Sequence, residues 1–538
     1  MNTKYKIINN RIRTKTGWGY TTIVCALLLL TIAGCKKNFE KDNTDGTGIP
    51  NSELQIPTLF PPLQSAIFHN YQTAQNLSAD GFAGYMMSPT PFKASYDLNY
   101  GLNDDWDKNG FNDAYTLVMA PLLRMSIIGV KKTDPDLWSI ALIVKVEAMH
   151  RVTDKFGPIA YSAVGKSLTS TPYDSQQSVY NRFFNELDTA VSGLQAYIAA
   201  NPGKKPFAAY DRIYGGDYAQ WIKFANSLRL RLAMHIVKAD AATAKLQAEK
   251  ALSPNNGGLL TAASDNAAIA VAPGSEADLY QITQEYGDNR LNASMATYLT
   301  GYKDPRLAVY ATPAIDGLFP GQYVGIRIGS DIKAKSDYVT YASPNTDKTF
   351  KINTPEQIMT AAEVWFLKAE AGLRGYANAG DPKTNYEKGI LTSMQQWGVD
   401  GAYTAYINDA TSTQAAYADP KNAANNSPAV STITIKWDEG ASNEVKLERI
   451  MTQKWLAVFP EGQEAWTEFR RTGYPKLFTV VNNTSNGAIN TQTQVRRLAY
   501  PSNEKTSNGA EVQKAVQLLG GPDNGGTRVW WDVDKGNF

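Results

Sequence analysis

The stretch Gly216–Leu252, GDYAQWIKFANSLRLRLAMHIVKADAATAKLQAEKAL, carries the strongest helical pattern of the chain. Apolar residues recur at i, i+4 and i+7 from Trp221, and a second apolar face begins at Ile222. A helix that is apolar on two faces is covered by neighbouring elements on both sides. This stretch therefore predicts the central helix of a mainly α-helical core.

Polar residues mark the start and the interior of the same helix. Asp217 can cap the first free N–H groups, and Gln220 is spaced as the reciprocal half of a capping box. Arg229 and Arg231 cannot both reach water from a covered helix, so we expect at least one to meet a carboxylate. We interpret these arginines as internal ties and not as ligand contacts.

Further helical patterns predict a scaffold of antiparallel helix pairs. They span 63–78, 112–132, 135–156, 178–200, 443–457 and 462–472. The helix-turn-helix unit 360–398 resembles a degenerate tetratricopeptide repeat, which favours a right-handed scaffold of tetratricopeptide-like pairs. Gly, Pro, Asn and Ser dominate the intervening segments, where 323–328 and 431–436 read as short strands. We expect the helical domain to span 63–538, with a scaffold at 63–253, 360–400 and 443–473 and a loop-rich lobe at 254–359 and 401–442. The C-terminal stretch 496–538 reads as irregular.

The N-terminus has the pattern of a lipoprotein signal. Five basic residues precede an apolar run at 21–33, which is too short to span a membrane, so 1–34 reads as a signal peptide. Thr31-Ile-Ala-Gly-Cys35 resembles a lipobox, in which the cysteine is acylated, for example with palmitate, and becomes the new N-terminus. Residues 35–62 are then a lipidated tether. The alternative is an ordinary cleavage site beside a stray cysteine.

Removing the signal changes the charge. Five of the 53 basic residues lie in it, which leaves 48 against 51 acidic residues. A slightly acidic body gives no electrostatic support for a nucleic-acid partner.

Catalytic motifs are sparse. The three histidines, His69, His150 and His235, form no HExxH pair, and no nucleophile elbow, Walker A loop or dinucleotide fingerprint is present. His235 lies on the central helix, where a hydrogen-bonded core histidine is favoured over a ligand or a base. Paired carboxylates for glycoside hydrolysis remain an open alternative, because their spacing is spatial.

One segment has the pattern of half a calcium loop. Asp105, Asp107 and Asn109 alternate as in an EF-hand, with Asp113 as a further oxygen ligand, but Thr116 occupies the twelfth place, where a glutamate is usual. A structural calcium ion is one interpretation. The other is a polar turn that leads into a helix after Asn112.

Aromatic residues in the loops suggest a ligand site. A flat ring can bury the apolar face of a sugar while neighbouring polar groups bond its hydroxyls. For any single ring, packing beneath its own loop is the favoured interpretation, so only the set of rings suggests a site. The candidate ligand residues are Tyr96, Tyr100, Asn103, Asp104, Trp106, Tyr280, Tyr286, Asn289 and Arg290.

Several passages together resemble one family, the SusD/RagB nutrient-binding lipoproteins of Bacteroidetes. They are Tyr214–Arg231, Arg151–Pro158, Asp304–Arg306, Ala362–Ala371, Gln453–Arg471 and Arg497–Pro501. The resemblance covers essentially the whole mature chain. Lys36 and Lys37 depart from it, because members often carry acidic residues directly after the lipidated cysteine.

The resemblance implies a non-enzymatic subunit at the outer membrane, lipid-anchored and exposed at the cell surface. Such a subunit acts as the lid of a SusC-like TonB-dependent barrel and delivers a glycan, without a cofactor other than a possible calcium ion. Three alternatives stay open at this point: a peptide-binding RagB-like subunit, a surface glycoside hydrolase, and a structural lid without a ligand.

Overall fold

The computed structural model describes residues 54–92, 96–167 and 169–538. Ile56–Phe538 forms one compact unit. The predicted signal peptide 1–34, the lipidation site Cys35 and the tether as far as residue 53 lie outside the described residues. Within the described part of the chain, no helix has the length and apolarity needed to cross a membrane.

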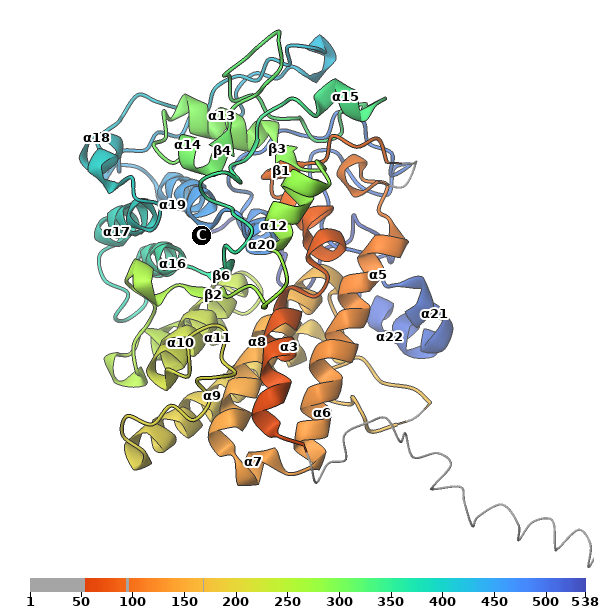
Figure 1. Cartoon of the computed structure of the whole chain (residues 1–538), viewed down its shortest axis with the longest axis vertical. Coiled ribbons are helices and arrows are strands. Elements are labelled where there is room, and N and C mark those ends of the chain that lie inside the picture. Colours follow the sequence, from red (N-terminus) through yellow and green to blue (C-terminus); the bar gives the residue numbers. More distant parts are fainter. Residues whose placement is uncertain (1–53, 93–95, 168) are drawn as a thin grey trace, which may run out of the picture. The chain divides into compact units, whose positions relative to one another are not determined.

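Antiparallel helix pairs form the scaffold, which confirms the predicted mainly α-helical, tetratricopeptide-like class. Neighbours along the chain pack on one another, and Figure 1 shows the first four of these helices together below the others. The helices are α8 (Pro135–Phe156), α9 (Gln176–Ala200), α10 (Tyr218–His235), α11 (Ala241–Leu252), α16 (Ala361–Leu373), α17 (Pro382–Gln396), α19 (Asn443–Val458) and α20 (Gly462–Thr472).

The central helix α10 is buried along both faces, as its pattern predicts. The Asp217 carboxylate accepts from the backbone N–H groups of Ala219 and Gln220 at 3.1 and 3.2 Å, so the predicted cap is confirmed. The reciprocal half of the capping box is wrong. The Gln220 side chain donates to Asp265 Oδ1 at 3.1 Å, because that acceptor comes from a distant loop that sequence spacing does not reveal.

The N-terminal helices follow their patterns in part. The predicted helix at 63–78 is interrupted at His69, where φ is 56°. Helical residues run without a break from Asp104 to Ile127, so the predicted helix at 112–132 begins earlier and is interrupted at Gly129, where φ is 88°. A positive φ ends a right-handed helix locally. The segments are α3 (Phe60–Ser65), the π-helix Gln72–Asn76, α4 (Ala79–Phe82), α5 (Asp104–Asp113), the π-helix Ala114–Met119, α6 (Ala120–Ile127) and α7 (Val130–Thr133).

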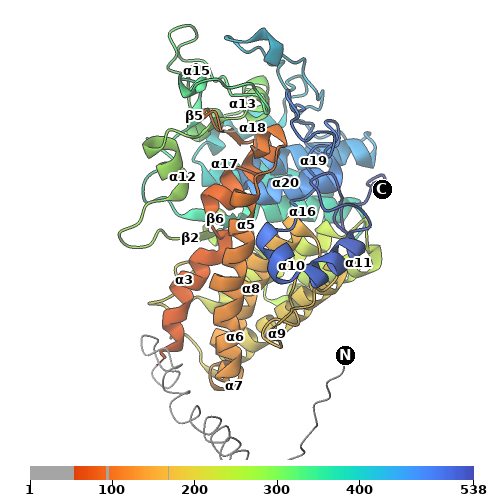
Figure 2. The same cartoon turned by 90° about the vertical axis from the view of Figure 1, so that its right-hand side faces the viewer.

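The loop-rich lobe contains short helices and three two-stranded antiparallel pairs. Its helices are α12 (Asp278–Tyr280), α13 (Ala293–Gly301), α14 (Leu307–Tyr310), α15 (Lys335–Tyr338) and α18 (Tyr403–Ile407). The strand pairs are β1 (Met86–Met87) with β3 (Arg290–Leu291), β2 (Ala267–Ile269) with β6 (Glu356–Met359), and β4 (Ala311–Thr312) with β5 (Ser343–Pro344). Figure 2 shows α12 on the edge of this part of the molecule, above β2 and β6.

Two predicted strands and the predicted irregular C-terminus are wrong. Ile326 makes only an isolated bridge with Asn292, and 431–436 forms no strand, because the Ser431 N–H bonds to the Gln414 side chain instead of a neighbouring strand. The C-terminal stretch contains α21 (Ser502–Ser507) and α22 (Gly509–Leu519).

Candidate functional site

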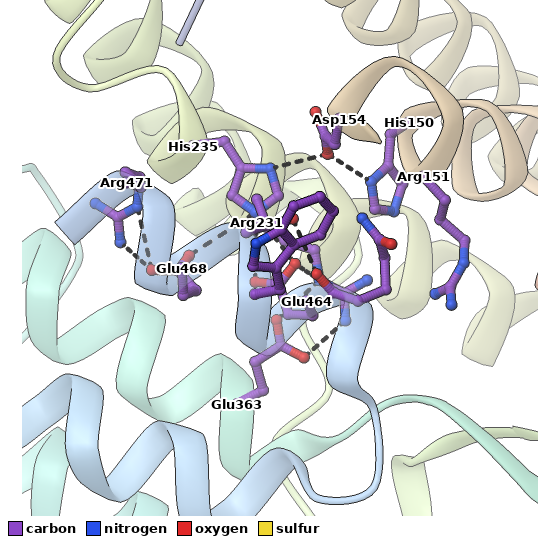
Figure 3. Close-up of polar contacts among 12 residues, drawn as sticks. His150, Arg151, Asp154, Arg231, His235, Glu363, Glu464, Glu468 and Arg471 are labelled. Atoms are coloured by element: carbon purple, nitrogen blue, oxygen red, sulfur yellow. Dashed lines mark hydrogen bonds and ion pairs between the residues drawn. The ribbon is translucent and has the colours of Figure 1, made fainter. Parts of the chain in front are cut away.

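The charged side chains of the central helix form a buried network. Arg231 is fully buried and donates to both Glu363 oxygens, at 2.8 and 2.7 Å, and to Glu147 at 3.4 Å. Arg229 donates to Asp188 at 2.5 Å. Figure 3 shows Arg231 and Glu363 within a larger set of polar contacts. The predicted internal ties are therefore confirmed.

His235 at the end of this helix has the surroundings of a core histidine. Its Nδ1 lies 3.2 Å from the Tyr180 hydroxyl, and its Nε2 lies 3.1 Å from Glu464 (Figure 3). Ligand atoms of His235, Glu464 and Glu468 come within 4.8 Å of one another, a spacing that could hold a metal ion. However, the Lys454 ammonium already contacts Glu464 at 2.8 Å and Glu468 at 3.2 Å. A cation of the protein itself thus balances these carboxylates, and we assign the cluster a structural role.

His150 is charged within the same network. Burial opposes its protonation, but the carboxylates of Glu147 and Asp154 outweigh burial and raise the pKa of His150 to about 9. The imidazolium contacts Asp154 at 3.1 Å and Glu147 at 3.4 Å. A histidine that stays charged at neutral pH stabilises its neighbours but is a poor general base.

The loop aromatics bring three rings together into what we call the aromatic cluster: Phe92, Tyr96 and Trp106. The Phe92 ring centroid lies 5.1 Å from that of Tyr96 and 4.9 Å from that of Trp106, the latter edge to face. Phe92 and Trp106 are partly exposed, whereas Tyr96 is buried. The cluster therefore presents aromatic surface to solvent, as stacking of a sugar requires.

Next to the cluster lies a hollow of about 140 Å³. It combines aromatic walls with polar groups on its rim, and Asp331 is the only carboxylate among the described residues that line it. The lining residues are Thr90, Pro91, Phe92, Tyr96, Asn99, Ser330, Asp331, Ile332 and Thr484. An open hollow of this mixture suits a polar ligand with one apolar face.

Asp288 ties together the loops around the hollow. Its carboxylate accepts from the Thr90 hydroxyl and, at 2.7 Å, from the Lys335 ammonium. Lys335 also donates to the Tyr286 backbone carbonyl. Pairing of β1 with β3, which joins Met87 to Arg290, brings the two predicted stretches of site residues into the same region.

Other predicted site residues have structural surroundings. Tyr100 and Asn289 are buried, and the Asn289 amide contacts Met86 Sδ at 3.0 Å. Arg290 donates to the backbone carbonyls of Val339 and Asn289, and burial lowers its pKa to about 10. Asn103 caps α5 through the N–H of Asp105. The expectation that many loop rings pack inside the protein holds for Tyr85, Tyr100, Phe111, Tyr338 and Tyr341.

The remaining predicted ligand residues are divided between surfaces. Asp104 is exposed but accepts from the Ser502 N–H at 3.0 Å, at the start of α21. Tyr286 is 43% exposed, and its backbone carbonyl accepts from Lys335. Tyr280 instead lines a different cavity, beneath α12.

The calcium-type residues lie on a helix and not in a loop. Asp105, Asn109 and Asp113 follow one another at four-residue spacing on α5, whereas Asp107 faces inward beside Asp97. Burial raises the pKa of Asp107 and raises that of Asp97 to about 7. Asp105 pairs with Lys108 at 2.6 Å, and Asn109 donates to Thr73. The four side chains do not share one face, and calcium binding by Asp105, Asp107, Asn109 and Asp113 stays a prediction.

Sequence reasoning missed several residues of the hollow: Asn99, Ser330, Asp331, Ile332 and Thr484. They come from three distant segments and carry no local motif. The polar composition of Gly329-Ser-Asp-Ile-Lys333 was the one sequence signal that could have suggested a loop at this site.

Comparisons with known proteins agree with this architecture. The family model described as "SusD-like: Susd and RagB outer membrane lipoprotein" matches residues 37–532. No curated protein sequence matches the chain.

Solved structures of SusD homologues are similar along their full length. A chitin-binding SusD homologue from Flavobacterium johnsoniae is 42% identical with a TM-score of 0.85, covering 90% of this chain and 100% of its own. A SusD homologue from Bacteroides vulgatus is 36% identical with a TM-score of 0.84, covering 90% and 98%. A third, from Bacteroides thetaiotaomicron, is 33% identical with a TM-score of 0.82, covering 90% and 100%. The chain therefore belongs to the SusD/RagB family of outer-membrane lipoproteins.

Proposed function

We propose that this protein captures oligosaccharides on the aromatic cluster and its hollow and passes them to a SusC-like TonB-dependent barrel. The observation that carries the proposal is the partly exposed pair Phe92 and Trp106 beside a polar-rimmed hollow. Chitin-type oligosaccharides are the first ligands to test, because the homologue that is 42% identical binds chitin.

The chemistry of the hollow favours binding over hydrolysis. Glycoside hydrolysis needs two carboxyl groups flanking the scissile bond. Among its described lining residues the hollow offers Asp331 alone. Family members are nutrient-binding lipoproteins, which agrees with a non-catalytic role.

Calorimetry on the full chain tests the ligand class. We expect chitohexaose to bind and Trp106→Ala or Phe92→Ala to weaken binding about tenfold, which corresponds to roughly 1.4 kcal/mol. Tyr286→Ala tests whether the ligand extends over the loops that Asp288 and Lys335 hold together. Trp365→Ala is the matched control, since this partly exposed ring lies on scaffold helix α16. If maltohexaose or a peptide panel binds while chitohexaose does not, the ligand class is wrong.

Two further outcomes separate the alternatives. Release of shorter sugars from polysaccharide by the purified protein would indicate a hydrolase. Copurification of a barrel, together with glycan and peptide titrations that show no binding, would indicate a structural lid.

Cys35→Ser should release the protein from the outer-membrane fraction if Cys35 carries the lipid. Protease shaving of intact cells would then test surface exposure.

A further inference from the structure

A second cavity, of about 260 Å³, lies beneath α12. It opens where the N-terminal segment, the β2–β6 pair and the end of α17 meet, and Figure 1 shows α12 above β2 and β6. Its lining is mostly apolar, in contrast to the polar-rimmed hollow beside the aromatic cluster. The two cavities have no lining residue in common.

Aromatic rings held by the core form the walls of this cavity. Phe68, Tyr71 and Phe350 are buried, and Tyr280 and Trp397 are partly exposed. Phe350 and Trp397 pack edge to face at 5.9 Å. The Tyr71 hydroxyl donates to Asp80 at 3.0 Å. These rings are preorganised, so a ligand would pay little entropy to order them.

Two carboxyl groups, Asp278 and Glu356, lie on the same wall. Glu356 Oε1 accepts from the Asp278 backbone N–H at 3.3 Å. Burial, followed by the charge of Asp278, raises the pKa of Glu356 to about 8, and burial also raises that of Asp278. At neutral pH Glu356 is therefore mostly protonated, and the two carboxyl groups share a proton that a bound cation would displace.

Neighbouring charges leave this pair unbalanced. Arg212 acts on Glu356 from nearby, but its guanidinium donates to Ser65 and to the carbonyl of Ala270. Glu461, the other acid on the wall, is already paired with Arg151 at 3.0 Å. Among the described residues no cation is in salt-bridge contact with this pair, so an ammonium group inside the cavity would favour the ionised form of both carboxyl groups.

Two neutral polar groups of the lining residues also lack partners. Among the described residues, Trp397 Nε1 and Gln396 Oε1 are buried without a hydrogen bond. The Gln396 amide nitrogen is committed to Gln357 Oε1 at 2.8 Å. Both atoms are buried away from the cavity surface, so they play no part in recognising a ligand there.

We propose that this cavity binds a small amphipathic amine, with its hydrocarbon part among the aromatic rings and its ammonium group beside Asp278 and Glu356. The aromatic faces add cation–π attraction to the charge of the carboxylates. A neutral sugar would leave most of its hydroxyls unbonded against this apolar lining, and an anion would be repelled. The site is independent of the glycan site proposed above.

Paired titrations test the proposal on the full chain. We expect 2-phenylethylamine to bind at least tenfold more tightly than 2-phenylethanol, which has the same shape without the charge, because hydrogen bonds to charged groups contribute more than neutral ones. The double variant Asp278→Asn with Glu356→Gln should reduce amine binding to the level of the alcohol. Asp534→Asn is the control, since it removes a carboxylate whose side chain is 85% exposed and pairs with Arg528.

A second variant keeps the test independent of the carboxylates. Ala268→Leu adds volume to the lining and should abolish binding of both compounds while circular dichroism stays unchanged. Equal binding of amine and alcohol, no binding of the amine, or full binding by the double variant would each overturn the proposal. Glycan titrations on the same variants should be unaffected, so that failure of one site is distinguishable from failure of the other.

Discussion

Arg231→Met is the substitution that best tests the role of the central helix. Methionine keeps most of the aliphatic volume of the side chain but removes the charge that contacts Glu363, Glu147 and, at 3.6 Å, Glu464. All four side chains are at most 1% exposed, so water cannot replace the lost guanidinium. Removing one partner of a buried ion pair typically costs about 3–5 kcal/mol.

The remaining cations set where in this range the loss falls. Lys454 still reaches Glu464 at 2.8 Å and Glu363 at 3.5 Å, and His150 still contacts Glu147 at 3.4 Å. We therefore expect a loss near 3 kcal/mol. For the compact unit Ile56–Phe538, an unfolding entropy of roughly 2.1 cal/mol/K per residue gives about 1 kcal/mol/K, so the melting temperature should fall by about 3 °C.

Urea unfolding and scanning calorimetry measure the effect. Arg182→Met is the matched control, because this arginine is 48% exposed and lies 4.0 Å from Asp174, so its loss should cost less than about 0.5 kcal/mol. Combining Arg231→Met with Glu363→Gln should cost less than the sum of the single changes, since the second removes the unpaired charge left by the first. A variant with unchanged stability, or one that melts normally but no longer binds its glycan, would refute the structural assignment.

Two other predictions concern pH and helix packing. His150 has a pKa of about 9 in the folded protein, because the carboxylates of Glu147 and Asp154 outweigh the effect of burial. The stability that it contributes is therefore complete below its unfolded pKa of about 6.5 and is lost as pH rises through 9. Urea unfolding from pH 6 to 10 should show this loss, and the variant His150→Gln should show a flatter pH dependence. Gly389→Ala should destabilise the protein by about 1–3 kcal/mol although alanine favours helices, because the new Cβ would lie 2.7 Å from the Phe366 ring. The control is Gly509→Ala, whose new Cβ would have no atom within 4 Å and which should be neutral or stabilising. Equal thermal shifts for the two glycine variants would contradict this account of α16–α17 packing.

Local sequence patterns predicted the scaffold closely. The apolar periodicity and terminal signals around Pro135–Phe156, Asp217–Leu252 and Gly462–Thr472 gave helices within a few residues of those observed. These signals are contained in one turn or one face of a helix, and the packing that they direct agrees with them. The N-terminal helices were less predictable, because His69 adopts a positive φ that its residue type does not demand.

The candidate site was predictable only in part. A density of aromatic and polar residues pointed to the loops, and Trp106 and Tyr96 do meet there. Which rings reach solvent could not be read from composition, since Tyr96 and Trp106 differ in burial although both lie among polar neighbours. Asp331 lines the same hollow as Tyr96 although the two residues are more than 200 positions apart in the sequence, and no local pattern predicts such a contact.

The sequence by itself determined the helical class, the capped central helix, the family and the need for buried partners of Arg231. These follow from periodicity, capping chemistry and the cost of an unpaired charge, which act over short distances or on any fold. Only the tertiary structure decided that Glu363 is the main partner, that Lys454 contacts Glu464 and Glu468, and that Asp278 and Glu356 share a cavity wall. Those facts depend on contacts between segments far apart in the chain, and their energies arise only when folding removes the groups from water.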